Sequence, residues 1–130
     1  VDCNIAREDR YSSRKTSYGI ILSMFNCGII ISYHELYRSE SPLRVLYHLF
    51  ETIKHWSPSV SVPPYLIYDN ACGLLLTLNT RMGNGKIIQT PASLTLANMI
   101  FVVDKFHISN HKRDTCKTKC NPYTSGCMQN

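Results

Sequence analysis

The chain has 130 residues, a hydrophobic fraction of 44%, a charged fraction of 18% and a formal net charge of +5. This length suits one domain with a buried core, and the composition excludes a wholly disordered protein. No apolar run is long enough to span a bilayer and no signal peptide opens the chain, so we expect an intracellular protein without a membrane anchor. Because the chain starts without Met, we expect a segment of a longer protein.

The six cysteines are Cys3, Cys27, Cys72, Cys116, Cys120 and Cys127. An even number is compatible with the disulfide framework of a small secreted protein. Three of them, however, lie in or beside apolar stretches, where a thiol behaves as a small hydrophobic group. A reducing compartment is therefore the favoured interpretation, and the disulfide protein is the less favoured alternative.

The N-terminal part predicts strands. Residues 1–6 are typical of a short strand that carries Asp2 near its start, and a charged loop follows. Residues 18–25 and 29–33 are apolar and rich in β-branched side chains, and they flank a turn signal at 26–28. This pattern predicts a β-hairpin.

A helix is predicted to begin at Ser41 and Pro42, which are suited to the N-cap and the first helical position. Its apolar stripe consists of Leu43, Leu46, Leu49, Phe50 and Ile53, which is the spacing of one buried helix face. The segment around Trp56 and Pro58 is expected to end this helix.

The central and C-terminal parts repeat one pattern, an apolar run that ends in an aspartate. Residues 65–68 precede Asp69, and residues 99–103 precede Asp104. Between them the sequence predicts a helix at 71–78, a loop at 81–86 and a short helix at 92–98. Ligands collect beyond the carboxyl ends of parallel strands, so the two carboxylates suggest a pocket of acids. The alternative is that either aspartate only caps a turn or a helix.

The predicted order of three strands, a helix, a strand, two helices and a strand is that of an α/β, ribonuclease H-like mixed sheet. In that fold the antiparallel strands come first and the parallel strands with helices follow, with a right-handed crossover. The first strand lies next to the Asp69 strand, so Asp2 and Asp69 would approach each other. We assign residues 1–107 to a partial ribonuclease H-like core and residues 108–130 to a Cys/His-bearing basic tail or insertion.

The tail has two features that indicate binding. Its cations are Lys105, Lys112, Arg113, Lys117 and Lys119, which favours contact with a polyanion backbone, although a solvated basic loop is the simpler explanation. His107, His111, Cys116 and Cys120 have the spacing His-x₃-His-x₄-Cys-x₃-Cys, and Cys127 follows. This density of nitrogen and sulfur suits Zn²⁺, with His111, Cys116, Cys120 and Cys127 as candidate ligands. The alternative is a pair of surface or structural histidines.

The motifs at 68–72 (YDNAC) and 101–107 (FVVDKFH), with His111 and Cys116 beyond them and Glu40-Ser41-Pro42 upstream, carry a family resemblance. They resemble the Kyakuja–Dileera–Zisupton transposases and their cysteine-cluster-associated relatives. The resemblance covers most of the chain, from about Tyr18 to Cys116.

This resemblance implies a nuclear protein that cuts and joins DNA through an Asp-Asp-Glu triad, with Mg²⁺ as the cofactor. Asp69 would be the second acid and Asp2 the first, and together they would bind Mg²⁺. Asp104 and His107 resemble the Asp-x-x-His element of several transposases, which places them in the catalytic region. The resemblance also implies that the chain could assemble with other transposase chains.

The third acid of the triad is not found, because the last glutamate in the chain is Glu51. Enzymatic activity therefore stays open, and we expect the chain to be inactive alone. The alternative is a non-catalytic, zinc-stabilised module, derived from a transposase, that binds nucleic acid or another partner.

Overall fold

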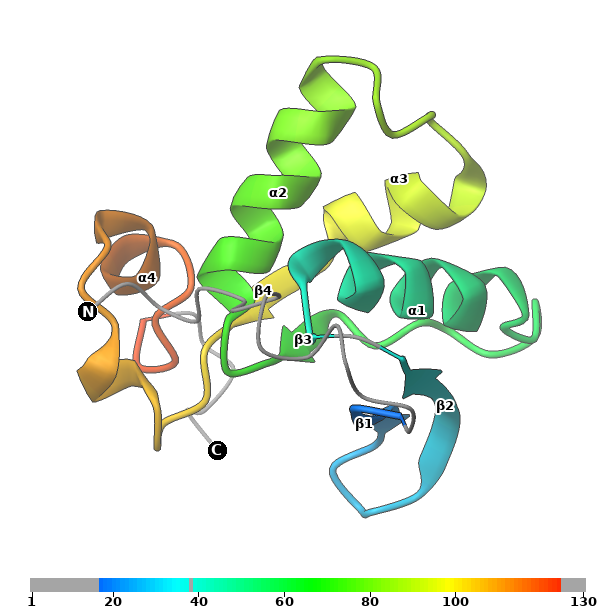
Figure 1. Cartoon of the computed structure of the whole chain (residues 1–130), viewed down its shortest axis with the longest axis horizontal. Helices are drawn as coiled ribbons and strands as arrows, with labels where there is room; N and C mark the ends of the chain where they lie inside the picture. The colour runs from blue at the N-terminus through cyan, green and yellow to red at the C-terminus, as the bar shows by residue number, and fades with distance from the viewer. Residues whose placement is uncertain (1–16, 38, 125–130) are drawn as a thin grey trace.

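A computed structural model describes residues 17–37 and 39–124. The predicted first strand, Asp2 and Cys127 lie outside these residues. The described part is a mixed α/β domain with two small sheets on one side of three helices (Figure 1). The mixed class is as predicted.

The hairpin consists of β1 (Gly19–Met24) and β2 (Ile30–Leu36), which pair antiparallel. Gly28 occupies the turn with φ +85°, a conformation that side chains with a Cβ rarely adopt. The hairpin prediction is confirmed, but its second strand does not end at residue 33. It continues to Leu36, because His34 and Glu35 pair with Ile21 and Ile20 of β1.

Helix α1 (Pro42–Lys54) begins as predicted, with Ser41 in extended conformation at the N-cap and proline in the first turn. The Ser41 side chain makes no capping hydrogen bond. Leu46 and Leu49 are buried as expected, whereas Leu43, which belongs to the predicted stripe, is 43% exposed. The buried face therefore starts at Val45 rather than at Leu43.

The parallel pair consists of β3 (Tyr65–Ile67) and β4 (Ile100–Val102). The helices α2 (Ala71–Gly83) and α3 (Pro91–Asn98) connect them. Helix α2 is longer than predicted, since residues 81–83 are helical rather than part of a loop. The helix ends only where Asn84 caps it and Gly85 takes φ +76°.

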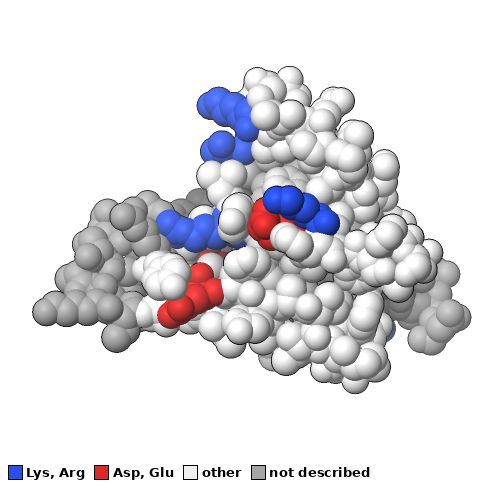
Figure 2. Space-filling model, turned by 90° about the vertical axis from the view of Figure 1, so that its right-hand side faces the viewer, with Lys and Arg blue, Asp and Glu red and all other residues white. Residues whose placement is uncertain are grey.

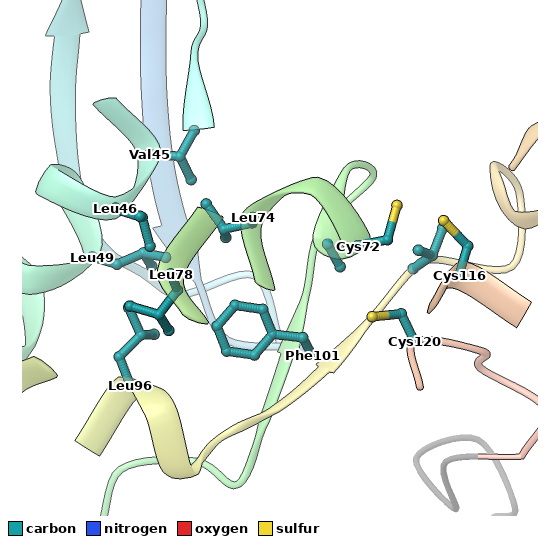
Figure 3. Close-up of a cluster of buried hydrophobic side chains, with 12 residues drawn as sticks. Val45, Leu46, Leu49, Cys72, Leu74, Leu78, Leu96, Phe101, Cys116 and Cys120 are labelled. Atoms are coloured by element: carbon teal, nitrogen blue, oxygen red, sulfur yellow. The ribbon is translucent and has the colours of Figure 1, made fainter. Parts of the chain in front are cut away.

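Within the described residues the strands form two separate two-stranded sheets, β1–β2 and β3–β4. Helix α1 joins them, because it contacts both hairpin strands and also packs on α2 and α3. The core lies between these helices and β4, and the side chains labelled in Figure 3 belong to it. Phe50 and Ile53 of α1 pack against this core as partly buried side chains.

The segment after β4 packs on the same core. A 3₁₀ helix (Ile108–Asn110) and the short helix α4 (Asp114–Thr118) follow the strand. The Val103 amide donates to the Cys120 carbonyl at 2.9 Å, and Cys116 and Cys120 are fully buried. Among the described residues, no helix combines the length and apolar character needed to cross a membrane.

Candidate functional site

The two predicted strand-end acids lie at the same end of the parallel pair. The register pairs Ile67 with Val102, so Asp69 and Asp104 each follow the last paired residue by two positions. Their strand-end placement is confirmed. The functional roles assigned to them stay predictions.

The carboxylate of Asp104 is engaged by its own turn. One oxygen accepts from the backbone amides of Phe106 and His107, at 3.0 and 3.1 Å. The other lies 2.8 Å from Nδ1 of His107. Burial alone would raise the pKa of Asp104, but the hydrogen bonds from His107 and Phe106 outweigh it and hold the pKa below its ordinary value. In the Asp-x-x-His element, both carboxylate oxygens of Asp104 are therefore engaged by its own turn and by His107.

Asp69 is less engaged. Its Oδ1 accepts from the amide of Asn70 at 2.6 Å, directly before α2 begins. The neighbouring Tyr68 donates its hydroxyl proton to Glu40, from the segment before α1. Burial, followed by this bond to Glu40, raises the pKa of Tyr68 well above its ordinary value. Glu40, from the motif upstream of α1, is thus hydrogen-bonded to the residue that directly precedes Asp69.

Close packing fixes the first turn of α2. A Cβ on Gly73 would lie only 2.6 Å from Oδ1 of Asn70, so any larger residue here would force the Asn70 side chain to move. The Asn70 side chain is buried, and its Oδ1 lies 3.9 Å from the Cys72 sulfur. These contacts hold Cys72 in a defined place beside the strand end.

Cys72 is part of a buried Cys/His cluster. Nδ1 of His111 lies 3.3 Å from Sγ of Cys72 and 3.3 Å from Sγ of Cys116. The three ligand atoms lie within 4.8 Å of one another. Cys72 comes from α2, Cys116 from α4 and His111 from the segment between the 3₁₀ helix and α4. The cluster could hold a metal ion such as zinc.

The cluster agrees in part with the predicted zinc ligands. His111 and Cys116 belong to it, and Cys127 lies outside the described residues. Cys120 is buried next to it (Figure 3), although it is not one of the three atoms that lie within 4.8 Å. Burial, and then the proximity of Cys72, raises the pKa of Cys120 to about 11. His107, whose spacing suggested a metal site, is paired with Asp104 instead.

Sequence reasoning missed Cys72 as a ligand. The residue was interpreted as a small hydrophobic side chain, and it is 39 positions from His111. The available signal was its place in the motif at 68–72.

The predicted DNA-binding cations are all exposed: Lys105, Lys112, Arg113, Lys117 and Lys119. Two exposed aromatic side chains, Phe106 and Tyr123, accompany them, and Nζ of Lys105 lies 5.6 Å from the Tyr123 ring centre. Figure 2 shows another face, which is mostly uncharged and has its cations in separate groups. No continuous basic band crosses the described part of that face.

The described residues do not by themselves provide a Mg²⁺ site. Mg²⁺ requires several hard oxygen ligands in octahedral geometry. Asp104 is occupied by its turn, which leaves Asp69 as the one strand-end carboxylate with an oxygen that is not engaged by the turn. The three-ligand group found among residues 17–37 and 39–124 contains sulfur and nitrogen, not carboxylates.

The strand-end acids, the Asp104–His107 pair and the Cys/His cluster thus belong to one mixed α/β domain. The family model of the Kyakuja-Dileera-Zisupton transposase matches residues 4–128. The chain therefore belongs to this transposase family, as the sequence motifs indicated. Searches of curated proteins and of solved structures give no match.

Proposed function

We propose that this chain is part of the core of a transposase for metal-dependent DNA strand cleavage and transfer. Family membership suggests a nuclear protein that acts on DNA. The observation that carries the proposal is the parallel register of β3 and β4, which brings Asp69 and Asp104 to one edge of the sheet. That edge is where α/β proteins bind their ligands.

The proposal includes a ribonuclease H-like sheet. An apolar groove of about 730 Å³ lies between β1, α1 and β3 and is lined by Leu22, Leu49 and Leu66 among others. The ribonuclease H-like order would add residues 1–6 as a first strand, next to the Asp69 strand. In that segment Val1, Cys3 and Ile5 alternate with polar residues, as a half-buried strand requires.

Such a first strand would bring Asp2 towards Asp69. The two acids are our candidates for the Mg²⁺ ligands, since Asp69 alone does not suffice. Asp104 would act by orienting His107, whose Nδ1 it holds, so that Nε2 points away from the pair. Because no glutamate follows Asp104 in this sequence, we expect the 130-residue chain to be inactive alone.

Cleavage assays on supercoiled DNA with Mg²⁺ test this function. We expect no nicking by residues 1–130. In a longer transposase chain that contains this segment, Asp69→Asn and Asp2→Asn should each abolish nicking, while Asp114→Asn should not. Asp114 is the matched control because it is an exposed aspartate of α4. Nicking that survives Asp69→Asn would overturn the assignment.

The basic segment would contact the DNA backbone rather than the bases. Lysine ammonium groups are compact cations suited to phosphate, and such binding weakens linearly with salt on a log–log scale. Replacing Lys112, Arg113, Lys117 and Lys119 by Ala should lower affinity and flatten the salt slope by up to about one unit per lost contact.

The control for this experiment is a variant in which three cations outside the tail, Lys54, Arg81 and Lys86, are replaced by Ala. It should bind DNA as the unmodified chain does. If the quadruple variant binds as well as this control, the tail does not bind DNA.

A second candidate function is a non-catalytic nucleic-acid-binding module derived from a transposase. The observation that favours it is the hydrogen bonding of Asp104, whose two carboxylate oxygens stabilise the turn at residues 104–107. DNA binding without cleavage in the longer chain, together with no effect of Asp69→Asn, would favour this module over the enzyme.

A further inference from the structure

The ligand atoms of the Cys/His cluster converge on a single point. Nδ1 of His111 is 3.3 Å from both Sγ of Cys72 and Sγ of Cys116. A ring nitrogen carries either one proton or one lone pair, so it cannot form two good hydrogen bonds at once. A metal ion between the three atoms would satisfy all of them.

The distances are close to those of a tetrahedral zinc site. Zn–S bonds of about 2.3 Å and Zn–N bonds of about 2.0 Å at tetrahedral angles place neighbouring nitrogen and sulfur ligands roughly 3.5 Å apart. The observed separations of 3.3 Å need only small shifts to reach this value.

We propose that Cys72, His111, Cys116 and Cys120 bind one Zn²⁺ ion, which fastens the segment after β4 to the N-terminus of α2. Cys120 is the fourth ligand because it is fully buried beside the other three and lies four positions after Cys116, just beyond the end of α4. This assignment does not depend on any catalytic role of the aspartates.

Ligand type and burial select zinc. Thiolates together with imidazole favour Zn²⁺ over Mg²⁺, which prefers oxygen. Cys72, Cys116 and Cys120 are 0% exposed, so the site is closed, as structural zinc sites are, rather than open to a substrate.

The fold gives the ion a structural task. Helix α4 has five residues, which is too short to be stable by itself. Its described anchors are the buried Cys116 and the bond from Val103 to Cys120. A metal bound to Cys72 would tie this segment to α2 across 39 positions of sequence, beside both strand-end aspartates.

Metal titration of the reduced 130-residue chain tests the proposal. We expect one Zn²⁺ or Co²⁺ per chain, and the Co²⁺ form should show the visible absorption of a tetrahedral site with thiolate charge-transfer bands. Cys72→Ser should weaken binding by at least about a hundredfold. Cys27→Ser is the matched control, since Cys27 is an exposed thiol in the hairpin turn, and it should bind as the unmodified chain does.

Two further comparisons keep the test decisive. His111→Cys retains a ligand, so it should still bind Co²⁺, with stronger charge-transfer absorption, even if the serine variants fail to fold. Cys120→Ser should weaken binding, whereas Cys127→Ser should not. Failure of the unmodified chain to bind Co²⁺, or equal binding by Cys72→Ser and Cys27→Ser, would overturn the site. The reverse result for Cys120 and Cys127 would overturn the fourth ligand.

Discussion

The hairpin β1–β2 and the parallel pair β3–β4 are held in the molecule by different forces. The hairpin strands are longer, yet one face exposes Ile20, Leu22, Met24 and Tyr33 by 37–69%. The parallel strands have three residues each, yet Phe101 and Val102 are 2% and 0% exposed. Strand length therefore does not determine how firmly each pair is attached. Burial of the β4 side chains Phe101 and Val102 anchors the parallel pair, and the hairpin needs another attachment.

That attachment is a chain of polar side chains between the hairpin and α1. Nε2 of His48 lies 2.8 Å from Oγ of Ser23, and its Nδ1 lies 2.7 Å from Nδ1 of His34. Ser32 and Thr52 form a second link at 2.6 Å. His48 is 1% exposed, so the imidazole at the centre of this chain is removed from water. Attachment of the hairpin should therefore weaken when the histidines at this junction are protonated. The parallel pair should instead be destabilised when a buried side chain is made smaller.

The largest effect is expected from Phe101→Ala. Removing a fully buried aromatic ring should lower the free energy of unfolding by about 3–5 kcal/mol. Tyr33→Ala is the control in the hairpin. Tyr33 is 69% exposed and opposes Leu22 across the strands, so its loss should cost less than about 1 kcal/mol. Urea denaturation of both variants measures the difference, and equal losses would contradict the contrast between the two regions.

Acidification should act on the hairpin junction. Burial, and then the neighbouring His34, lowers the pKa of His48 from 6.5 to about 4 in the folded chain. Between these values the unfolded chain binds a proton that the folded chain excludes. Stability is therefore complete above about pH 6.5 and falls as the pH drops towards 4, by at most about 3 kcal/mol.

A His48→Gln variant isolates this contribution. It should be less stable at pH 7, yet lose less stability than the unmodified chain between pH 6.5 and 4. His55→Gln is the control because His55 is an exposed histidine at the C-terminal cap of the same helix. Parallel pH profiles for the His48 variant and the unmodified chain would show that His48 is not the group responsible.

The sequence predicted local elements well because their signals are local. The hairpin turn, the start of α1 at Ser41-Pro42 and the strands that end before Asp69 and Asp104 all follow from neighbouring residues. The His34–His48 contact and the entry of Cys72 into the cluster depend on how elements pack. Nothing in the spacing of 14 or 39 positions indicates such contacts.

Replacing glycine by alanine should change the free energy of unfolding in opposite directions at the two ends of α2. Gly73→Ala places a Cβ 2.6 Å from Asn70, and we expect a loss of about 1–3 kcal/mol beside the parallel pair. Gly83→Ala meets nothing within 4 Å, so the gain in helix propensity should stabilise the chain by up to about 1 kcal/mol. Thermal unfolding compares the two, and a stable Gly73→Ala variant would show that the packing near β3 is loose.

The smallest effect on stability is expected from Asp104→Asn, which changes the turn that follows β4. The asparagine oxygen can still accept from the amides of Phe106 and His107, so the turn should persist. The change removes only the contact between the second carboxylate oxygen and Nδ1 of His107. The side chains of Asp104 and His107 are 29% and 45% exposed. Exposed ion pairs contribute little, and we expect a loss of about 0.5 kcal/mol. Asp104→Ala also removes the turn acceptor and should cost about 1–2 kcal/mol. If both variants unfold at the same urea concentration, the carboxylate contributes nothing to the turn, and its position at the strand end would then need a functional explanation.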